Sequence, residues 1–486
     1  MTTLHWSEGR LLAFTKGAPE SILPLCTRQQ GSSAATDLTP DERKKILAQG
    51  QAFAQQAYRV LAVAMREVER GVEELDADSI EHGLTFLGLV AMMDPPHREV
   101  PDAITTCRRA GIRVIMITGD HPLTALAIAR KVGLAQQSVV TDPGRFVPVI
   151  EGAQIDGFSD EQLRRLLTPT GPGEPDPIFA RMAPRHKMRI VSVLKDMREV
   201  VAVTGDGVND APALKTADID IAMGVAGTDV AKETASMILL DDNFATIVSA
   251  IEEGRAVFMN IRKFMTYVLA SNVPEVVPYL AFGLSSAPLA LTVPQILAVD
   301  LGTDMVPALA LAAEPPQGNV MDEPPRPRTE RLLNREMLVR AYGFLGLIET
   351  AVAMGGFFLY LHHQGWAWGS PLDWSTPLYK EATTVTFAGI VAAQAANVFA
   401  CRSDRISAFR LGWFSNPLIV LGIVVEVALL LIMTYSPVGH WVLGTASLPA
   451  WIFVPLLLGA VGLLFADELY KLVRPRMNAK QPGRMN

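Results

Sequence analysis

Long apolar runs in the second half of the chain constrain its fold more than any other feature. A helix of about 20 apolar residues is long enough to cross the hydrocarbon core of a bilayer. Six such runs lie at 264–284, 290–311, 339–361, 382–401, 417–435 and 449–468. One run alone would also suit a buried helix of a soluble protein. Six in succession predict an α-helical membrane domain with six spans, which we place at 256–474.

Positive charge is unevenly distributed among the loops between these runs. It gathers after the second run at Arg326, Arg328, Arg331 and Arg335, after the fourth at Arg402, Arg405 and Arg410, and in a tail at 475–486. The alternate loops hold tryptophans and almost no Lys or Arg. Because loops rich in Lys and Arg remain in the cytoplasm, we expect a multi-pass protein of the cell membrane. Its N-terminal domains and its C-terminal tail would both be cytoplasmic.

The first half of the chain alternates charged and apolar segments, as soluble domains do. The net charge of −7 over 486 residues gives no indication of nucleic-acid binding. The cysteines, Cys26, Cys107 and Cys401, are far apart and predict no disulfide framework.

Strands and helices alternate between residues 85 and 255, which predicts a doubly wound α/β domain. Apolar strands are expected at 88–93, 113–117 and 200–203, and helices at 101–110 and 121–132. Ligands of such sheets bind beyond the carboxyl ends of the strands. The polar residues found at those ends are Asp94, Thr118, Asp120, Asp206 and Asp210.

The turn after the last of these strands, Thr204 to Lys215, reads TGDGVNDAPALK. It places Asp206 and Asp210 four residues apart on a glycine-rich turn. Glycines let a backbone approach an anion closely, and carboxylates at a strand end suit a hard cation such as Mg²⁺. A purely structural Gly/Asp turn is the alternative for the GDG triplet alone, but it explains the whole string poorly.

This string resembles the hinge motif of P-type cation-transporting ATPases, membrane pumps that form an aspartyl-phosphate intermediate. Thr118-Gly119-Asp120 and the run from Phe179 to Lys187 resemble further motifs of the family's phosphorylation domain, in family order. One departure is His97, which stands before Arg98 where the family reads Asp-Pro-Pro-Arg.

The resemblance implies a HAD-like phosphorylation domain at 85–255 that acts on ATP with Mg²⁺. In it Asp206 would coordinate Mg²⁺, Thr118 would hydrogen-bond the phosphoryl group and Lys187 would neutralise it. The implied catalytic set is Thr118, Gly119, Asp120, Lys187, Asp206, Asn209 and Asp210.

Lys16-Gly17-Ala18-Pro19-Glu20 resembles the family's nucleotide-binding motif, so residues 1–84 would be the C-terminal part of a nucleotide-binding domain. Arg59 matches a family arginine that contacts the nucleotide phosphates, although an ordinary surface arginine is an equally good interpretation of this residue by itself. The implied nucleotide contacts are Lys16, Gly17, Arg59, Asp94, Asp120 and Arg181.

Polar and acidic residues interrupt the first two apolar runs. Asn272 and Glu275 lie in the first; Asp300, Thr303 and Asp304 lie in the second, where their spacing puts them on one helix face. Ionisable groups inside a membrane are costly and usually functional. These oxygens suit a transported hard cation such as Ca²⁺, Na⁺ or K⁺. The alternative is a polar patch that only packs helices.

The same helices resemble the type II pumps, and Asp300-Leu-Gly-Thr303-Asp304 is more similar to sodium/potassium pumps than to muscle-type calcium pumps. Gln394 and Asn397 match positions where particular subfamilies carry acids, and Glu426 offers a further ligand or a proton site. The identity of the ion therefore stays open.

The family's phosphorylated aspartate belongs to a DKTGT motif, and the sequence contains no such motif. The actuator domain and the family's earlier spans are missing as well. We therefore expect the C-terminal half of a type II pump, which alone would neither autophosphorylate nor transport. The alternatives are a non-catalytic membrane protein that binds ATP and Mg²⁺, a subunit that needs a separate N-terminal half, and, least supported, a phosphatase domain on a membrane anchor.

Overall fold

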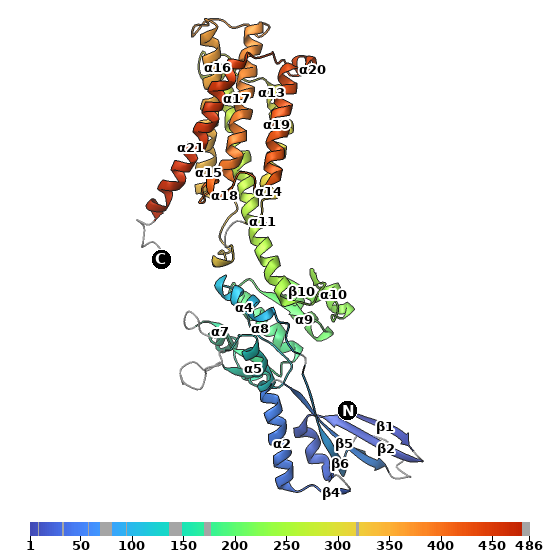
Figure 1. The fold of residues 1–486 in the computed structure, drawn as a ribbon. Coiled ribbons are helices and arrows are strands. Elements are labelled where there is room, and N and C mark those ends of the chain that lie inside the picture. The colour runs from blue at the N-terminus through green and yellow to red at the C-terminus, as the bar shows by residue number, and fades with distance from the viewer. Residues whose placement is uncertain are drawn as a thin grey trace. The chain divides into compact units, whose positions relative to one another are not determined.

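The computed structural model describes residues 1–7, 9–31, 34–56, 58–68, 80–93, 95–135, 148–169, 176–316 and 320–478, with only the backbone described for 474–478. The chain forms two compact units. The first comprises Met1–Ala250 and Met321–Pro325, and the second comprises Ile251–Val320 and Arg326–Asn486. Figure 1 identifies their helices and strands.

A six-stranded mixed sheet begins the first unit, in the order β1-β2-β5-β6-β3-β4. Its strands are β1 (Thr2–Ser7), β2 (Arg10–Gly17), β3 (Cys26–Gln30), β4 (Ala35–Asp37), β5 (Arg59–Val68) and β6 (Leu84–Met92). All neighbours are antiparallel except β3 and β6. The helices α1 (Pro19–Ile22), η1 (Leu23–Leu25) and α2 (Pro40–Gln55) contribute Ile22, Leu23, Ile46 and Leu47 to the apolar cluster on one face of this sheet.

β6 corrects the expected division of the chain. Residues 88–93 are expected in the doubly wound domain, but β6 pairs with β5 and β3 inside the first sheet. Leu84 and Phe86 explain this position, because both are buried in the cluster beneath that sheet. The residue pattern of an apolar strand does not indicate which sheet the strand joins. Its pairing with neighbouring strands determines that.

The rest of the first unit contains parallel strands in two separate sheets. β9 (Ala202–Gly205), β10 (Ile219–Met223) and β11 (Met237–Leu239) form one, and β7 (Val149–Glu151) and β8 (Ile178–Ala180) form the other. The strand expected at 113–117 is not formed, but an isolated bridge joins Ile117 to Phe179 of β8: Phe179 N donates to Met116 O at 2.9 Å, and Thr118 N donates to Phe179 O at 2.8 Å. The expected single sheet is therefore divided between two.

Helices connect these strands: α4 (Val100–Arg109), α5 (Pro122–Lys131), α6 (Gly152–Gly157), α7 (Asp160–Leu167), α8 (Pro184–Asp196), η2 (Val208–Asp210), α9 (Ala211–Thr216) and α10 (Asp229–Thr234). α4 and α5 are the two helices expected from the sequence. α8 lies against both sheets, since Ile190 and Val193 belong to one apolar cluster against which Ile115, Ile117 and Val201 pack.

The second unit is helical. Five stretches of the described chain are long and apolar enough to cross a membrane: Val293–Ala312, Arg335–His363, Pro377–Cys401, Pro417–Tyr435 and Ala450–Val473. They comprise α13 (Val293–Ala298), η3 (Val299–Thr303) and α14 (Met305–Ala312); α15 (Arg335–Arg340), η5 (Ala341–Leu345) and α16 (Gly346–His363); α17 (Pro377–Cys401); α19 (Pro417–Tyr435); and η6 (Ala450–Ile452) with α21 (Phe453–Asn478). They correspond to the last five expected spans. The remaining short helices are η4 (Val320–Asp322), α18 (Ala408–Leu411) and α20 (Pro437–Val442).

The expected first span, 264–284, is not among these five stretches of the described chain. The helix is interrupted at Asn272, which divides it into α11 (Phe244–Ser271) and α12 (Val273–Leu284). Pro274 explains the break, because proline has no N–H to bond back to the preceding turn and its ring crowds that turn.

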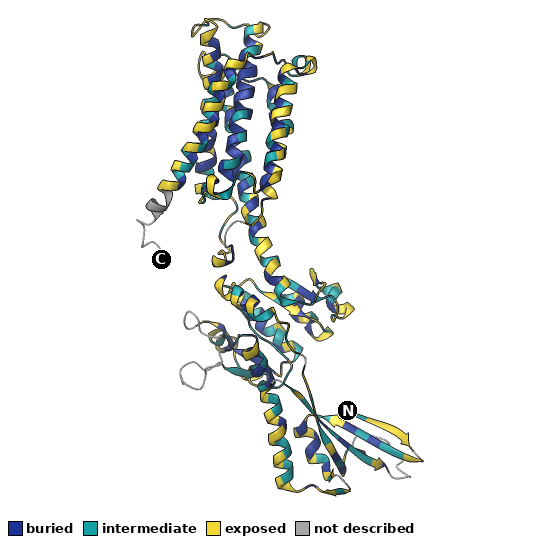
Figure 2. Cartoon of the chain, viewed as in Figure 1, coloured by how far each residue is buried: buried dark blue, intermediate teal, exposed yellow. Residues whose placement is uncertain are grey.

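α17 is the central helix of this unit. Of its most apolar window, 83% is buried, against 28% for the windows of α19 and α21. It packs on α16, α19 and α21. Figure 2 shows buried residues on the inner faces of the helices and exposed residues on the outer faces. The polar side chains of α17 are therefore directed at neighbouring helices.

We predict that Gly389 sets the spacing between α16 and α17. A Cβ there would lie 2.9 Å from Ala353 Cα and 3.3 Å from Leu456 Cδ2, so Gly389→Ala must push the helices apart. We expect a loss of about 1–3 kcal/mol of stability, measured as a lower melting temperature in lipid nanodiscs. Gly355→Ala is the control, since nothing lies within 4 Å of a Cβ there. Equal melting of the two variants would contradict the role of Gly389.

Candidate functional site

The turn after β9 is organised around Asp210. Its Oδ2 accepts the backbone N–H groups of Asp206 at 3.3 Å and Gly207 at 3.2 Å, and its Oδ1 accepts Lys187 Nζ at 2.6 Å. Gly205 permits this fold, because a Cβ there would lie 2.5 Å from Asp210 Cβ. Lys187 comes from the first turn of α8, so the structure brings together two residues that are 23 positions apart.

Asp210 is therefore held as a carboxylate. Burial would raise its pKa, but the hydrogen bond and the charge of Lys187, with the N–H groups of Gly207 and Asp206, lower the pKa below its usual value. Both carboxylate oxygens already have donors. Asp210 is consequently placed to fix Lys187 and the turn, rather than to coordinate a metal directly.

Asp206 has the opposite character. It is exposed, and its carboxylate takes part in no hydrogen bond or ion pair among those found between described residues. A free carboxylate beside an anchored turn fits Mg²⁺, which usually binds proteins through one or two carboxylates. Asn209, the second residue of η2, is exposed as well.

Thr118 and Asp120 lie in a second turn. Asp120 N donates to Thr118 Oγ1 at 3.1 Å, Met182 N donates to Thr118 O at 3.0 Å, and Arg181 N donates to Asp120 O at 2.9 Å. Arg181 has a φ of 51°, a left-handed conformation that is uncommon for a residue with a side chain. Gly119 lies beside this contact, since a Cβ there would approach Met182 O at 4.0 Å. Arg181 and Met182, to which this turn is bonded, lie just before α8, which carries Lys187.

The expected nucleotide residues share one face of the first sheet. Lys16 pairs with Val63, and Arg59 lies four residues from Val63 on β5, so the alternation of a strand directs both side chains to the same side. Both residues are exposed. Phe14 is on this face too, where its ring contacts that of His5 at 5.7 Å. On the opposite side, a Cβ on Gly17 would lie 3.0 Å from Ile22 Cδ1.

Two of the other expected nucleotide contacts lie elsewhere. Asp120 and Arg181 are bonded to each other in the second turn, and no hydrogen bond between described residues joins them to Lys16 or Arg59. Asp94 lies outside the described residues.

The expected cation residues gather near the break between α11 and α12. Glu275 and Asp304 are 6% exposed and Thr303 is fully buried, while Asn272 is half-buried at the break. Ser271 Oγ donates to Asp304 Oδ1 at 3.4 Å. The helical geometry differs from the expectation: residues 299–303 form a π-helical turn, with Asp304 N donating to Val299 O at 3.0 Å, and Asp300 is exposed, although it interacts with Glu275 and Asp304. The presumed α-helical face is thus broken by the wider turn.

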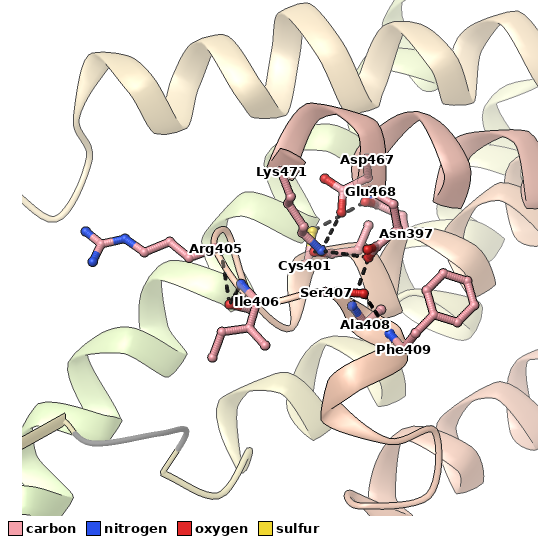
Figure 3. A network of polar contacts seen from close by, with 12 residues as sticks. Asn397, Cys401, Arg405, Ile406, Ser407, Ala408, Phe409, Asp467, Glu468 and Lys471 are labelled. Carbon is pink, nitrogen blue, oxygen red and sulfur yellow. Dashed lines mark hydrogen bonds and ion pairs between the residues drawn. The ribbon is translucent and has the colours of Figure 1, made fainter. Parts of the chain in front are cut away.

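Gln394, Asn397 and Glu426 are fully buried on α17 and α19. Both polar atoms of Gln394 and both carboxylate oxygens of Glu426 lack a hydrogen-bond partner within the described structure, as does Asn397 Nδ2. Cys401 Sγ donates to Asn397 Oδ1 at 3.3 Å (Figure 3). Among the described residues, no three His, Cys, Asp or Glu side chains form a group able to hold a metal ion.

Glu349 is a buried acid that is not among the residues expected at the cation site. It lies on α16, is fully buried, and interacts electrostatically with Asp304 and Glu275. Its place inside the expected span 339–361 is the signal that would have identified it, by the same rule that selects Glu426.

Other buried acids of this unit have basic partners. Asp467 pairs with Arg340 at 2.7 Å and with Lys471 at 2.6 Å, and Glu314 pairs with Arg402 at 2.6 Å. Figure 3 shows Lys471 beside Asp467 and Glu468. Arg402, expected as a loop charge that sets orientation, is only 1% exposed and serves the Glu314 pair instead.

Two family models match the chain: "Cation transporting ATPase, C-terminus" over residues 288–473 and "P-type ATPase, cytoplasmic domain N" over residues 1–99, a range that includes β6. Both describe P-type ATPases or cation-transporting ATPases, in agreement with the resemblance of the motifs.

Curated relatives agree with these models. The sodium/potassium-transporting ATPase subunit alpha-3 of Homo sapiens is 37% identical over 533 residues, covering 97% of this chain and 51% of the relative. The alpha-2 subunit of Gallus gallus is 39% identical over 492 residues, covering 88% of this chain and 46% of the relative. The chain spans about half the length of the curated relatives it matches. The chain therefore belongs to the P-type cation-transporting ATPases.

Proposed function

We propose that this chain supplies the nucleotide, Mg²⁺ and cation sites of a pump that hydrolyses ATP to move a hard cation across the cell membrane. The observation that carries the proposal is the Lys187–Asp210 pair at 2.6 Å beside the free carboxylate of Asp206. A fixed cation next to a free carboxylate is the arrangement that phosphoryl transfer needs for positioning and charge compensation.

Each residue has a distinct part in this proposal. Asp206 would hold Mg²⁺, which when bound neutralises charge on phosphoryl oxygens. Lys187 presents a positive charge whose position is fixed by Asp210. The Thr118 hydroxyl accepts the N–H of Asp120, which leaves its own O–H free to donate to a phosphoryl oxygen. Lys16, Gly17 and Arg59 would hold the nucleotide on the open face of the first sheet.

We further propose that the phosphorylated aspartate comes from a strand outside these 486 residues. β9 pairs only with β10 among the described strands, and the segment around 115–118 bonds on one side to β8. Both edges rest on α8. A parallel strand carrying DKTGT between them would unite the two sheets into one HAD-like, doubly wound sheet and bring the acceptor to Lys187 and Asp206.

The ion is proposed to be Na⁺ or K⁺ rather than Ca²⁺. The relatives named above are sodium/potassium-transporting ATPases, and the buried Gln394 and Asn397 amides add neutral oxygens to the acids. We also propose that α11 and α12 together provide the sixth span. The Arg-rich loops would then lie in the cytoplasm with both termini.

Coexpression with the N-terminal half of a sodium/potassium-transporting alpha subunit tests the function. With γ-labelled ATP we expect an acid-stable, hydroxylamine-sensitive phosphoprotein only when both halves are present, with Na⁺-dependent formation. Asp304→Asn should abolish that dependence, because it removes a buried carboxylate from the cation site. Asp373→Asn, an exposed acid in the loop before α17, is the control.

Three outcomes of this experiment are informative. Phosphorylation of this chain alone would show that the acceptor lies within it. Phosphorylation whose level does not change with Na⁺, K⁺ or Ca²⁺ would contradict the presence of a transport site. No phosphorylation of the combined halves, with intact ATP binding, would favour the alternative of a non-catalytic nucleotide-binding membrane protein.

The nucleotide site is tested separately on the purified chain. We expect Lys16→Met and Arg59→Leu each to weaken ATP binding about tenfold, a loss of about 1.4 kcal/mol, by titration calorimetry. Arg10→Met is the matched control, because Arg10 lies on the same strand and face at the other end of β2 and pairs with Glu67 at 3.6 Å. Equal weakening by all three variants would indicate a general charge effect instead of a site.

Asp210 predicts a pH dependence. Its pKa is lowered in the folded state relative to about 3.9 in an unfolded chain. The stability that it contributes is therefore complete above about pH 4 and is lost as the pH falls through the folded value. Asp210→Asn should cost about 1.5–3 kcal/mol near pH 7 and much less at low pH, measured by hydrogen exchange of α8 and α9 in a urea series.

The control for this prediction is Asp196→Asn. Asp196 makes a surface pair with Arg164 at 3.6 Å, with side chains 65% and 44% exposed. Surface pairs contribute about 0–1 kcal/mol, so little change is expected at either pH. A pH-independent loss in Asp210→Asn would contradict the ionised state assigned to Asp210.

A further inference from the structure

Glu349 is the buried acid of the second unit for which neither the motifs nor the paired charges account. It is fully buried in the first turn of α16, and neither carboxylate oxygen has a well-formed hydrogen-bond partner within the described structure, although the Asn397 side chain interacts with it. An ionised carboxylate without a partner is very costly in an apolar interior. Such a group either holds a proton or is ionised against a compensating charge or ligand.

The position of Glu349 on α16 is fixed by close packing at Gly346. A Cβ on Gly346 would lie 2.8 Å from Ala270 O, so α16 touches the end of α11 just before the break at Asn272. Glu349 follows three residues later, on the same side of the helix. It faces the Asn397 amide of α17 and interacts with Asp304 and Glu275.

The basic side chains buried in this unit are already engaged. Arg340 and Lys471 pair with Asp467, and Arg402 pairs with Glu314. Lys263 donates to Asn260 Oδ1 at 3.0 Å. Among the described residues, these contacts leave the charge of Glu349 without a protein cation.

The neighbours of Glu349 also have buried polar atoms without hydrogen-bond partners. Glu426 interacts with Glu349 electrostatically, and both of its carboxylate oxygens lack partners among described atoms. Gln394 lies three residues from Asn397 on α17, and its amide oxygen and nitrogen are likewise without partners. Carboxylate and amide oxygens together form a ligand set for a hard cation.

We propose that Glu349 supplies a carboxylate ligand from α16 to a bound hard cation, together with Gln394 and Asn397 of α17 and Glu426 of α19. The inference rests on the proposed function, and it adds a residue and a helix to the cation site. No three described acids form a metal-holding group by themselves, so the amide oxygens are required to complete the coordination. Glu349 thereby determines how much charge the site accepts.

The test is equilibrium binding of radiolabelled Na⁺, Rb⁺ and Ca²⁺ to the purified 486-residue chain in lipid nanodiscs. We expect the wild-type chain to bind at least one of these ions. Glu349→Gln keeps the shape of the side chain but removes its charge, and should weaken binding at least tenfold. Glu349→Asp, which retains the charge, should keep part of the affinity. Glu336→Gln, at an exposed acid of α15, is the matched control and should bind as wild type does.

Melting temperature separates loss of binding from loss of folding. A ligand that binds only the folded state raises its stability, so the ion should raise the melting temperature of the wild type. Without the ion, Glu349→Gln should melt no lower than wild type, because it removes an uncompensated buried charge, yet it should lose the ion-dependent rise.

The outcomes distinguish this inference from the function on which it rests. If wild type binds an ion and Glu349→Gln binds it equally well, Glu349 is not a ligand and the cation site stands without it. If wild type binds none of the three ions, the cation site and the role of Glu349 both fail. If Glu349→Gln melts far below wild type without ion, the buried carboxylate is structural and the inference is overturned.

Discussion

A carboxyl group inside an apolar helix bundle must be protonated, paired with a charge, satisfied by donors, or bound to an ion. The second unit uses this requirement in two ways. Asp467 and Glu314 are neutralised by Arg340, Lys471 and Arg402, and the pairs with Arg340 and Arg402 join segments distant in sequence. Glu349 and Glu426 have no comparable partners within the described structure. The pairing state thus separates acids that hold helices together from acids available to a ligand.

The first unit divides its acids in the same manner. Asp210 is saturated by one lysine and two backbone donors, and it holds the turn that displays Asp206. Asp206 remains exposed. A rigid, satisfied residue next to an unsatisfied one gives a preorganised site whose geometry does not depend on the ligand. Such preorganisation is the main route by which proteins stabilise charge during phosphoryl transfer.

The sequence predicted local elements better than their assembly. Hydrophobic length predicted five of the helical stretches, and strand ends predicted the turns at Thr118 and Asp206, because both depend on nearby residues. β6 was assigned to the wrong sheet, since an apolar strand has the same pattern in either sheet. The π-helical turn at 299–303 and the pairing of Arg402 with Glu314 depend on contacts between distant segments, which periodicity does not report.

The free edge of β9 also bears on how this chain behaves during synthesis. Val200, just before the strand, is 59% exposed, and the strand pairs only with β10 among the described strands. Unpaired strand edges are templates for pairing with other chains. Newly synthesised copies that expose this edge could pair with one another through it, in competition with correct assembly. The timing with which a complementary strand reaches β9 would therefore govern the yield of correctly assembled protein.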